Sequence, residues 1–319
     1  MPLDNGDFLR SVGGVALMRG ITTAPAWYFG WVPHQPAVEA YLRSAPRELF
    51  AAVSAPLTDS GSGRTVLLYE AARQVWGRDL DVGPQLIGDC VSWGFGGCVD
   101  LVACLEVVAG EAEEYPWKQR ATTEVIYALS RVEYGNFDGS DEDGSYGSWA
   151  AKAVKQGGTL SRMLLGPYDP LRAKKWGADG LPDEYEPQAK QHRIRRTAVV
   201  RSFEEARDAI ANGYPVAVCS DQGFDMVRDE QGFAAGNGTW YHCMKFVASR
   251  DDHRPGLLCM NSWGPNAPTG PKGEHDIPDG SFWVDAQTCT RMLQQGDSFA
   301  LSQFDGYPRR ASVLAAFSR

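Results

Sequence analysis

Three polar residues at the borders of apolar segments could together carry out nucleophilic chemistry: Asn261, His242 and Cys90. Asn261 ends the apolar run of GLLCMNSWG (256–264), where a buried amide without a partner would cost about 1 to 3 kcal/mol. His242 lies on the preceding predicted strand, TWYHCMKFV (239–247), and the short link between the two strands makes them neighbours. An Asn261 side-chain oxygen that accepts the imidazole N–H would fix the tautomer of His242 and leave its other ring nitrogen facing a nucleophile.

Cys90 is the predicted nucleophile. Side chains alternate along a strand, so Cys243 must point away from the face that carries His242. Cys90 opens the apolar run 90–110, where unpaired backbone N–H groups and the helix dipole lower the pKa of a thiol. The same N–H groups can stabilise an oxyanion, and the side-chain amide of Gln85 can supply a second donor. A nucleophile, a base, an orienting residue and oxyanion donors are thereby assigned.

The elements that must position these residues change character along the chain. Helical periodicity prevails first, and several of these segments end on glycine (66–77, 90–110, 121–135 and 145–158). A capping box from Ser202 to Glu205 opens one more helix, and predicted strands then dominate (214–220, 239–250, 256–263 and 281–285). This segregation predicts an α+β fold in which a helical lobe faces a sheet lobe, with ligands bound between them.

Composition narrows the possible partners and surroundings. A net charge of −9 and a pI near 5.1, without long basic runs, argue against nucleic acid as a partner. No signal-peptide pattern occurs and no apolar run is as long as the roughly 18 residues of a membrane span, so neither export nor a membrane is expected. Seven scattered cysteines without a CxxC pair favour reduced, buried thiols in a reducing, cytoplasm-like environment. The oligomeric state is not encoded in any pattern.

Familiar cofactor and metal motifs are missing from the sequence. The loop after Asp138 places Asp141, Asp143 and Gly144 at the third, fifth and sixth positions of a calcium loop. Its first position is Gly139 and its twelfth is Ala150, where carboxylates are needed, so a solvated loop is predicted. We expect neither a metal nor a cofactor.

Three segments in this order, GDCVSWGF (88–95), WYHCMKFV (240–247) and CMNSWG (259–264), resemble the active-site segments of the papain-like cysteine peptidases. The resemblance implies a two-lobed fold with a helical lobe facing an antiparallel sheet or barrel and the active-site cleft between them. It also implies that Cys90 is the nucleophile, His242 the general base and acid, and Asn261 the residue that orients the histidine. Gln85 would be the oxyanion-hole side chain, and Trp263 would shield the histidine from water.

The resemblance spans about residues 76 to 304 and suggests a division of the chain. Residues 1–75 would be an arm packed on the body, without the charged helix pair of the family's prosegments, and residues 76–319 the papain-like domain. Within that domain the helical lobe would cover about 76–180 and the sheet lobe about 181–319. By family implication the substrate groove is lined by Gly144, Ser145 and Tyr146, and Tyr241, just before the histidine, is expected beside it.

Departures from the family pattern leave alternatives open. Ile87 and Val91 stand where family members have a cysteine and an aromatic residue, and Gln85 lies five rather than six residues before Cys90. A shifted alignment of SWGF would make Ser92 the nucleophile instead.

The predicted function is a cysteine peptidase that acts on a peptide or protein substrate through an acyl-enzyme. One alternative is a catalytically weak or silent structural or binding module of a larger assembly. A further alternative is an acyl transferase or isopeptidase that uses the same triad, since transfer differs from hydrolysis only in the acceptor.

Overall fold

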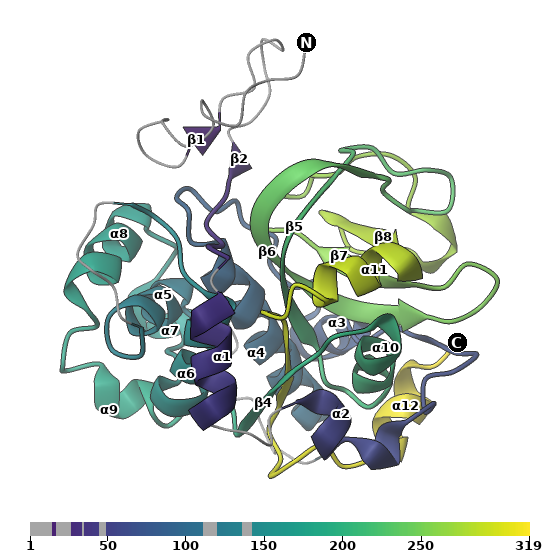
Figure 1. Ribbon diagram of the computed structural model, residues 1–319, viewed down its shortest axis with the longest axis horizontal. Coiled ribbons are helices and arrows are strands. Elements are labelled where there is room, and N and C mark those ends of the chain that lie inside the picture. The colour runs from purple at the N-terminus through teal and green to yellow at the C-terminus, as the bar shows by residue number, and fades with distance from the viewer. Residues whose placement is uncertain (1–14, 17–26, 34, 45–48, 111–119, 136–141) are drawn as a thin grey trace.

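The computed structural model describes residues 15–16, 27–33, 35–44, 49–110, 120–135 and 142–319. A group of helices lies beside an antiparallel sheet, as Figure 1 shows, and the predicted α+β class is confirmed. The segregation has a simple origin, because the apolar residues of the first half recur with a helical period and those of the second half gather in short runs rich in β-branched and aromatic residues.

The helical part surrounds one long buried helix, α4 (Cys90–Val108). Its apolar residues face every direction, which is typical of a helix enclosed by other elements. Around it, or following it in the chain, are α1 (Gln35–Ser44), α3 (Glu70–Trp76), α5 (Thr123–Arg131), α6 (Gly147–Lys152), α7 (Arg162–Leu165), α8 (Pro170–Asp179) and α9 (Glu186–Ala189). A single π-helical turn, Ala153–Gly157, continues α6.

Helix α4 corrects one expectation from the sequence. By length and composition it could cross a membrane, although no apolar run had been expected to reach that length. Most of the helix is buried inside the protein, and a core helix has the same composition. The helix also approaches the sheet closely, because a Cβ on Gly94 would lie 2.8 Å from Cys243 Sγ and 2.9 Å from the Met244 carbonyl oxygen.

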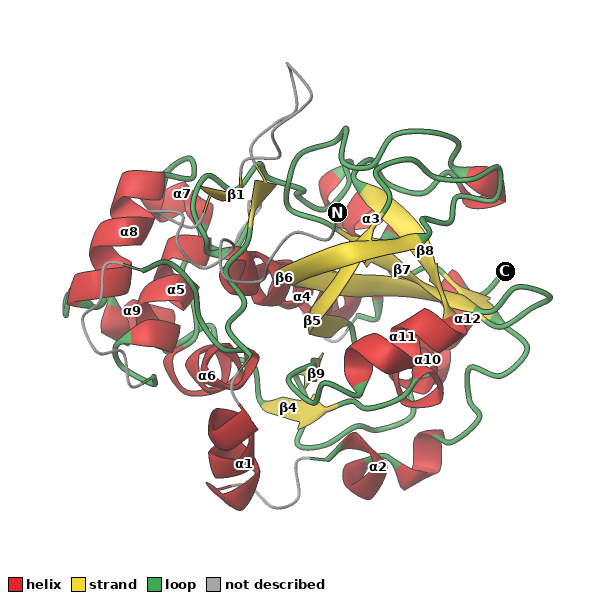
Figure 2. Ribbon diagram, turned by 45° about the horizontal axis from the view of Figure 1, so that its top comes forward, coloured by secondary structure: helices red, strands yellow, loops and turns green. Residues whose placement is uncertain are grey.

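The sheet has the strand order β4-β9-β5-β6-β7-β8, and β3 pairs with β6 beside this path; every pairing is antiparallel. Its strands are β3 (Thr65–Val66), β4 (Arg196–Val199), β5 (Val216–Phe224), β6 (Gly236–Arg250), β7 (Gly256–Met260), β8 (Ser281–Asp285) and β9 (Phe299–Ser302). A separate pair, β1 (Val15–Ala16) and β2 (Trp27–Tyr28), precedes the body. Figure 2 shows α10 (Phe203–Ala211) and α11 (Ala286–Leu293) against the sheet; α2 (Phe50–Val53) and α12 (Ala311–Phe317) lie nearby.

Local sequence signals explain how the elements begin and end. Ser202 caps α10, accepting the Glu205 N–H through its side chain, while the Glu205 carboxylate returns to the Arg201 N–H rather than to that of Ser202. Strand β7 ends at Met260, so Asn261 follows the strand directly, as its position after the apolar run predicts.

The predicted arm contributes to the body. β3 joins the sheet and α3 packs along α4, although β3 and all but the last residue of α3 belong to residues 1–75. The division of the chain into arm and domain stays a prediction.

Candidate active site

His242 and Asn261 lie together, as predicted. His242 Nε2 is 2.8 Å from Asn261 Oδ1, and both side chains are fully buried. The Trp263 ring stacks on the imidazole with 4.4 Å between centroids, so it covers the pair. The other imidazole nitrogen, Nδ1, has no hydrogen-bond partner. Burial lowers the pKa of His242 to about 3, against the opposing effect of the Asn261 hydrogen bond, so the imidazole is neutral in this conformation.

Cys90 lies at the first turn of α4, beside the strand that carries His242. Its Sγ accepts the backbone N–H of Cys243 at 3.3 Å. Burial raises the pKa of the Cys90 thiol well above its ordinary value, and the neighbouring Cys243 raises it further, while the N–H groups of Cys243 and Gly30 act in the opposite direction. The lowered pKa that the sequence position predicts is therefore not found in this conformation, because the loss of water outweighs the backbone N–H groups.

Gln85 is held next to Asn261 in spite of its irregular spacing. Its backbone N–H donates to the Ser262 carbonyl oxygen at 2.9 Å, and its side-chain oxygen accepts the Ser262 hydroxyl. Its side-chain Nε2 donates to the carbonyl oxygens of Tyr28 at 3.1 Å and Ile87 at 3.0 Å. The side-chain amide that is predicted to bind an oxyanion here binds two carbonyl oxygens of the chain itself.

Residues Tyr28 to Val32, which we call the groove segment, cross this site. The Tyr241 carbonyl oxygen accepts the N–H groups of Gly30 at 3.2 Å and Trp31 at 3.1 Å. Ser145 pairs with Trp31 as a parallel bridge, donating to the Gly30 carbonyl and accepting the Val32 N–H. The groove segment is thus bound as an extended chain between the helical part and the strand of the histidine.

Aromatic side chains close the site on the other side of the histidine. The Phe29 ring contacts His242 and Trp263 edge-on, at centroid distances of 6.1 Å and 5.4 Å. Trp263 Nε1 donates to the Tyr28 carbonyl oxygen at 3.1 Å. Water is therefore kept from the imidazole by residues of the groove segment as well as by Trp263.

Gly30 lies in close backbone contact with the loop before α4. A Cβ at this position would lie 1.8 Å from the Gly88 carbonyl oxygen, two residues before Cys90. Only glycine can therefore pass here unless the loop before α4 moves.

Asp297 anchors the groove segment to both parts of the protein. Its fully buried carboxylate accepts Trp31 Nε1 at 2.8 Å and the backbone N–H groups of Gly147 and Ser148, each at 2.7 Å, at the start of α6. Burial raises the pKa of Asp297 to about 7, although all three hydrogen bonds favour the ionised form.

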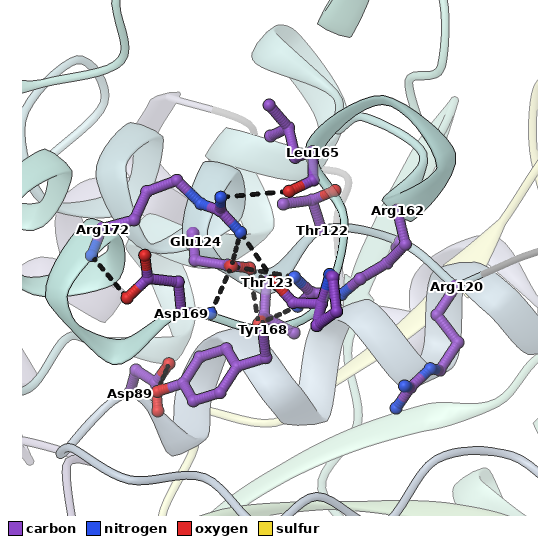
Figure 3. Close-up of polar contacts among 12 residues, drawn as sticks. Asp89, Arg120, Thr122, Thr123, Glu124, Arg162, Leu165, Tyr168, Asp169 and Arg172 are labelled. Atoms are coloured by element: carbon purple, nitrogen blue, oxygen red, sulfur yellow. Dashed lines mark hydrogen bonds and ion pairs between the residues drawn. The ribbon is translucent and has the colours of Figure 1, made fainter.

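A polar network lies beside the N-terminus of α4 (Figure 3). Tyr168 donates its hydroxyl to Asp89 at 3.0 Å, and burial raises the pKa of the Asp89 carboxyl well above its ordinary value. Glu124, also buried, pairs with Arg162 and Arg172, each at 2.7 Å. These ion pairs join α5, α7 and α8 (Figure 3).

The remaining predicted residues lie on or near the groove segment, with the exception of Ser92. Ser145 and Tyr241 bind the groove segment directly, and the Gly144 carbonyl oxygen accepts Arg131 Nη1. Tyr146 is the residue before α6, and its ring contacts that of Trp149 with 4.0 Å between centroids. Ser92, the alternative nucleophile, is fully buried and its hydroxyl has no hydrogen-bond partner, whereas Cys90 contacts the residue after His242.

The loop considered for calcium has another role at one position. Asp141 lies outside the described residues, and Asp143 Oδ2 accepts the Gly88 N–H at 3.2 Å. Among the residues that the structure describes, no group of three metal-ligating side chains occurs.

The groove segment and Asp297 were missed by sequence reasoning. Gly30 carried a weak signal, since a glycine between two aromatic residues suggests a close backbone approach, but its partner is 58 positions away by number in the loop of Gly88. Asp297 and Trp31 are separated by 266 residues, so only the tertiary structure brings them together.

Comparison with known proteins shows the fold. No family model matches the sequence and no curated protein matches it. Among solved structures, the cysteine protease xylellain from Xylella fastidiosa matches with a TM-score of 0.54 and 15% identity, over 86% of this chain and 91% of that one. The chain has the papain-like fold. The proform of the ragweed cysteine protease Amb a 11 matches with a TM-score of 0.50 and 14% identity, over 80% and 69% of the two chains.

Proposed function

We propose that this protein is a papain-like thiol hydrolase that cleaves amide bonds in peptides or proteins through an acyl-enzyme. The observation that carries the proposal is the His242–Asn261 hydrogen bond beside Cys90. An amide holds one ring nitrogen and leaves Nδ1 unpaired, which is the arrangement that a general base next to a thiol needs. The papain-like fold supports it.

The proposed reaction begins when Cys90 Sγ passes its proton to His242 Nδ1 and attacks the carbonyl carbon. The oxyanion would be bound by N–H groups at the start of α4 and by Gln85 Nε2. His242 then returns the proton to the leaving amine, and water cleaves the thioester. Proton transfer contributes roughly 10² to 10⁴-fold and the oxyanion donors roughly 10² to 10³-fold in such mechanisms.

The groove segment supports a peptide-like substrate. Ser145 and Tyr241 already bind an extended backbone, and Gln85 already binds a backbone carbonyl. The same contacts mean that a substrate can enter only after the groove segment leaves. Departure of this segment also admits water, which removes the burial that keeps Cys90 and His242 neutral.

The proposal is tested with a fluorogenic peptide library and a peptidyl epoxysuccinate near neutral pH, on the full chain and on its Gly30→Ala form. We expect hydrolysis by the wild type that the Cys90→Ala substitution abolishes. The control substitution Cys98→Ala, which changes a buried cysteine further along the same helix, should leave hydrolysis unchanged. Labelling should map to Cys90 and be lost in His242→Ala. Turnover that persists in folded Cys90→Ala would exclude the proposed nucleophile.

A second candidate, a silent binding or structural module, is favoured by the occupied groove and the complete burial of Cys90 and His242. It predicts neither hydrolysis nor single-site labelling in the Gly30→Ala form. Acyl transfer would appear instead as hydrolysis that gives way to amide formation when an amine is added.

A further inference from the structure

Two cysteines that the proposed mechanism does not use lie side by side next to His242. Cys219 on β5 is the register partner of Cys243 on β6, and their Sγ atoms are 2.9 Å apart. Both side chains are fully buried, and Cys243 directly follows His242. The two residues are 24 positions apart in the chain and meet only because β5 and β6 are neighbouring strands.

The position of the pair in the ladder suits a covalent bond. The Cys219 N–H donates to Ser298 Oγ at 3.1 Å and its carbonyl accepts Ser298 Oγ at 3.4 Å, while the Cys243 N–H donates to Cys90 Sγ. The backbone groups of Cys219 and the N–H of Cys243 therefore bond elsewhere, so the two residues form a non-hydrogen-bonded pair. Facing Cα atoms at such positions are about 4.5 Å apart, within the roughly 4.4 to 6.8 Å that a disulfide spans.

We propose that Cys219 and Cys243 form a disulfide when the chain folds in the presence of a small-molecule disulfide, and that this bond clamps β5 to the strand that carries His242. The thiolate of one cysteine attacks the small disulfide, forming a mixed disulfide and releasing one small thiol. The thiolate of the other cysteine then displaces the second small thiol. Two protein thiols lose two protons and two electrons, and the small disulfide gains them.

Burial determines when this bond can form. Burial raises the pKa of the Cys219 thiol well above its ordinary value, and its contact with Cys243 raises it further, so the reactive thiolate is scarce once the sheet is closed. The bond therefore forms while the strands are still accessible, and the closed sheet afterwards shields it from reductants. The disulfide would also fix the backbone at Cys243, whose N–H donates to Cys90 Sγ, and would thereby restrict the surroundings of Cys90.

The test refolds the full chain from denaturant, either in a mixture of oxidised and reduced glutathione or in a phosphine reductant alone. Remaining thiols are alkylated under denaturing conditions, and the protein is digested without reduction and mapped by mass. We expect one cross-linked peptide pair that joins Cys219 to Cys243 in most of the oxidised, folded protein. Thermal unfolding should shift upward by about 5 to 10 °C relative to the reduced sample.

Matched variants separate this pair from the other thiols. Cys259→Ser changes a buried cysteine on the neighbouring strand β7, and this variant should still form the disulfide. Cys219→Ser should not form it, and no other pair of cysteines should become cross-linked in its place. Alkylated Cys219 and Cys243 in oxidised, folded protein would overturn the proposal, and so would a bond between Cys90 and Cys243. The readout is a peptide mass, so the result does not depend on whether the protein is a hydrolase.

Discussion

Replacing Gly30 by alanine should open the groove. The φ angle of Gly30 lies outside the left-handed region, so alanine is compatible with its backbone, and the effect of the substitution is steric. The new Cβ would lie 1.8 Å from the Gly88 carbonyl oxygen and 2.3 Å from its carbon, which no rotamer can relieve. Either the groove segment or the loop before Cys90 must move.

The size of the effect follows from the contacts. Five hydrogen bonds hold Gly30, Trp31 and Val32, which at about 1 kcal/mol each gives at most about 5 kcal/mol for the closed state. Overpacking costs about 1 to 3 kcal/mol, and contact with rigid backbone places this site at the upper end. A change of about 3 kcal/mol raises the open population by roughly 100-fold.

Alkylation of Cys90 measures that population. The assay is the rate of modification by iodoacetamide at neutral pH, followed by intact mass and peptide mapping, in wild type, Gly30→Ala and Val32→Ala. Val32 belongs to the same segment, but its side chain is 39% exposed, so the control should label at the wild-type rate. We expect roughly 100-fold faster labelling of Cys90 in Gly30→Ala.

An unchanged rate in a Gly30→Ala protein that keeps its circular dichroism and melting temperature would refute the reasoning. Cys90 would then be reached by a route that the groove segment does not control. Faster labelling of all seven cysteines together would indicate global unfolding and would equally contradict a local opening.

Three further predictions concern buried polar groups. Asn261→Ala removes the acceptor of His242 and should lower turnover about tenfold, as a loss of roughly 1.5 kcal/mol implies. The melting temperature near neutral pH should fall as well, because the imidazole N–H stays buried without its partner. Burial raises the pKa of Asp297 to about 7, so the stability that this carboxyl contributes is complete at low pH and is lost as the pH rises toward and through 7. The melting temperature of the wild type should therefore fall over this pH window relative to that of Asp297→Asn. Parallel curves of melting temperature against pH for the two proteins would contradict the prediction. Glu124→Gln leaves the Arg162 guanidinium buried without its charge partner. The free energy of unfolding, measured in urea, should fall by about 3 to 5 kcal/mol. A loss below about 1 kcal/mol would argue against a structural role for the ion pair.

The placement of His242 beside Asn261 could be predicted because its signals are local. The apolar run before Asn261 gives a strand that ends at Met260, and the short link to the previous strand makes β6 and β7 neighbours. Because side chains alternate along β6, those of His242 and Cys243 lie on opposite faces of the sheet, and the Cys243 side chain contacts that of Cys219 in the core. The class of fold follows from the same periodicities.

The groove segment could not be predicted in this way. Tyr28 to Val32 has neither helical nor strand periodicity, and its conformation is imposed by Tyr241, Ser145 and Asp297, which are distant in the sequence. Strands β4 and β9 were missed for a related reason, since each has four residues and they pair with one another across about a hundred positions. Short strands of this kind acquire their structure from the partner.

The groove segment is part of the same chain as the site, so any molecule that is to enter the site must bind strongly enough to displace it. Helix α1 starts three residues after Val32 and packs near α6, so the segment is tethered within a few residues of its binding position. A tethered ligand acts at an effective concentration that reaches millimolar values for short linkers. If the protein acts as proposed, an incoming peptide must therefore outcompete a segment that never diffuses away, and a peptide that binds weakly is not expected to displace it.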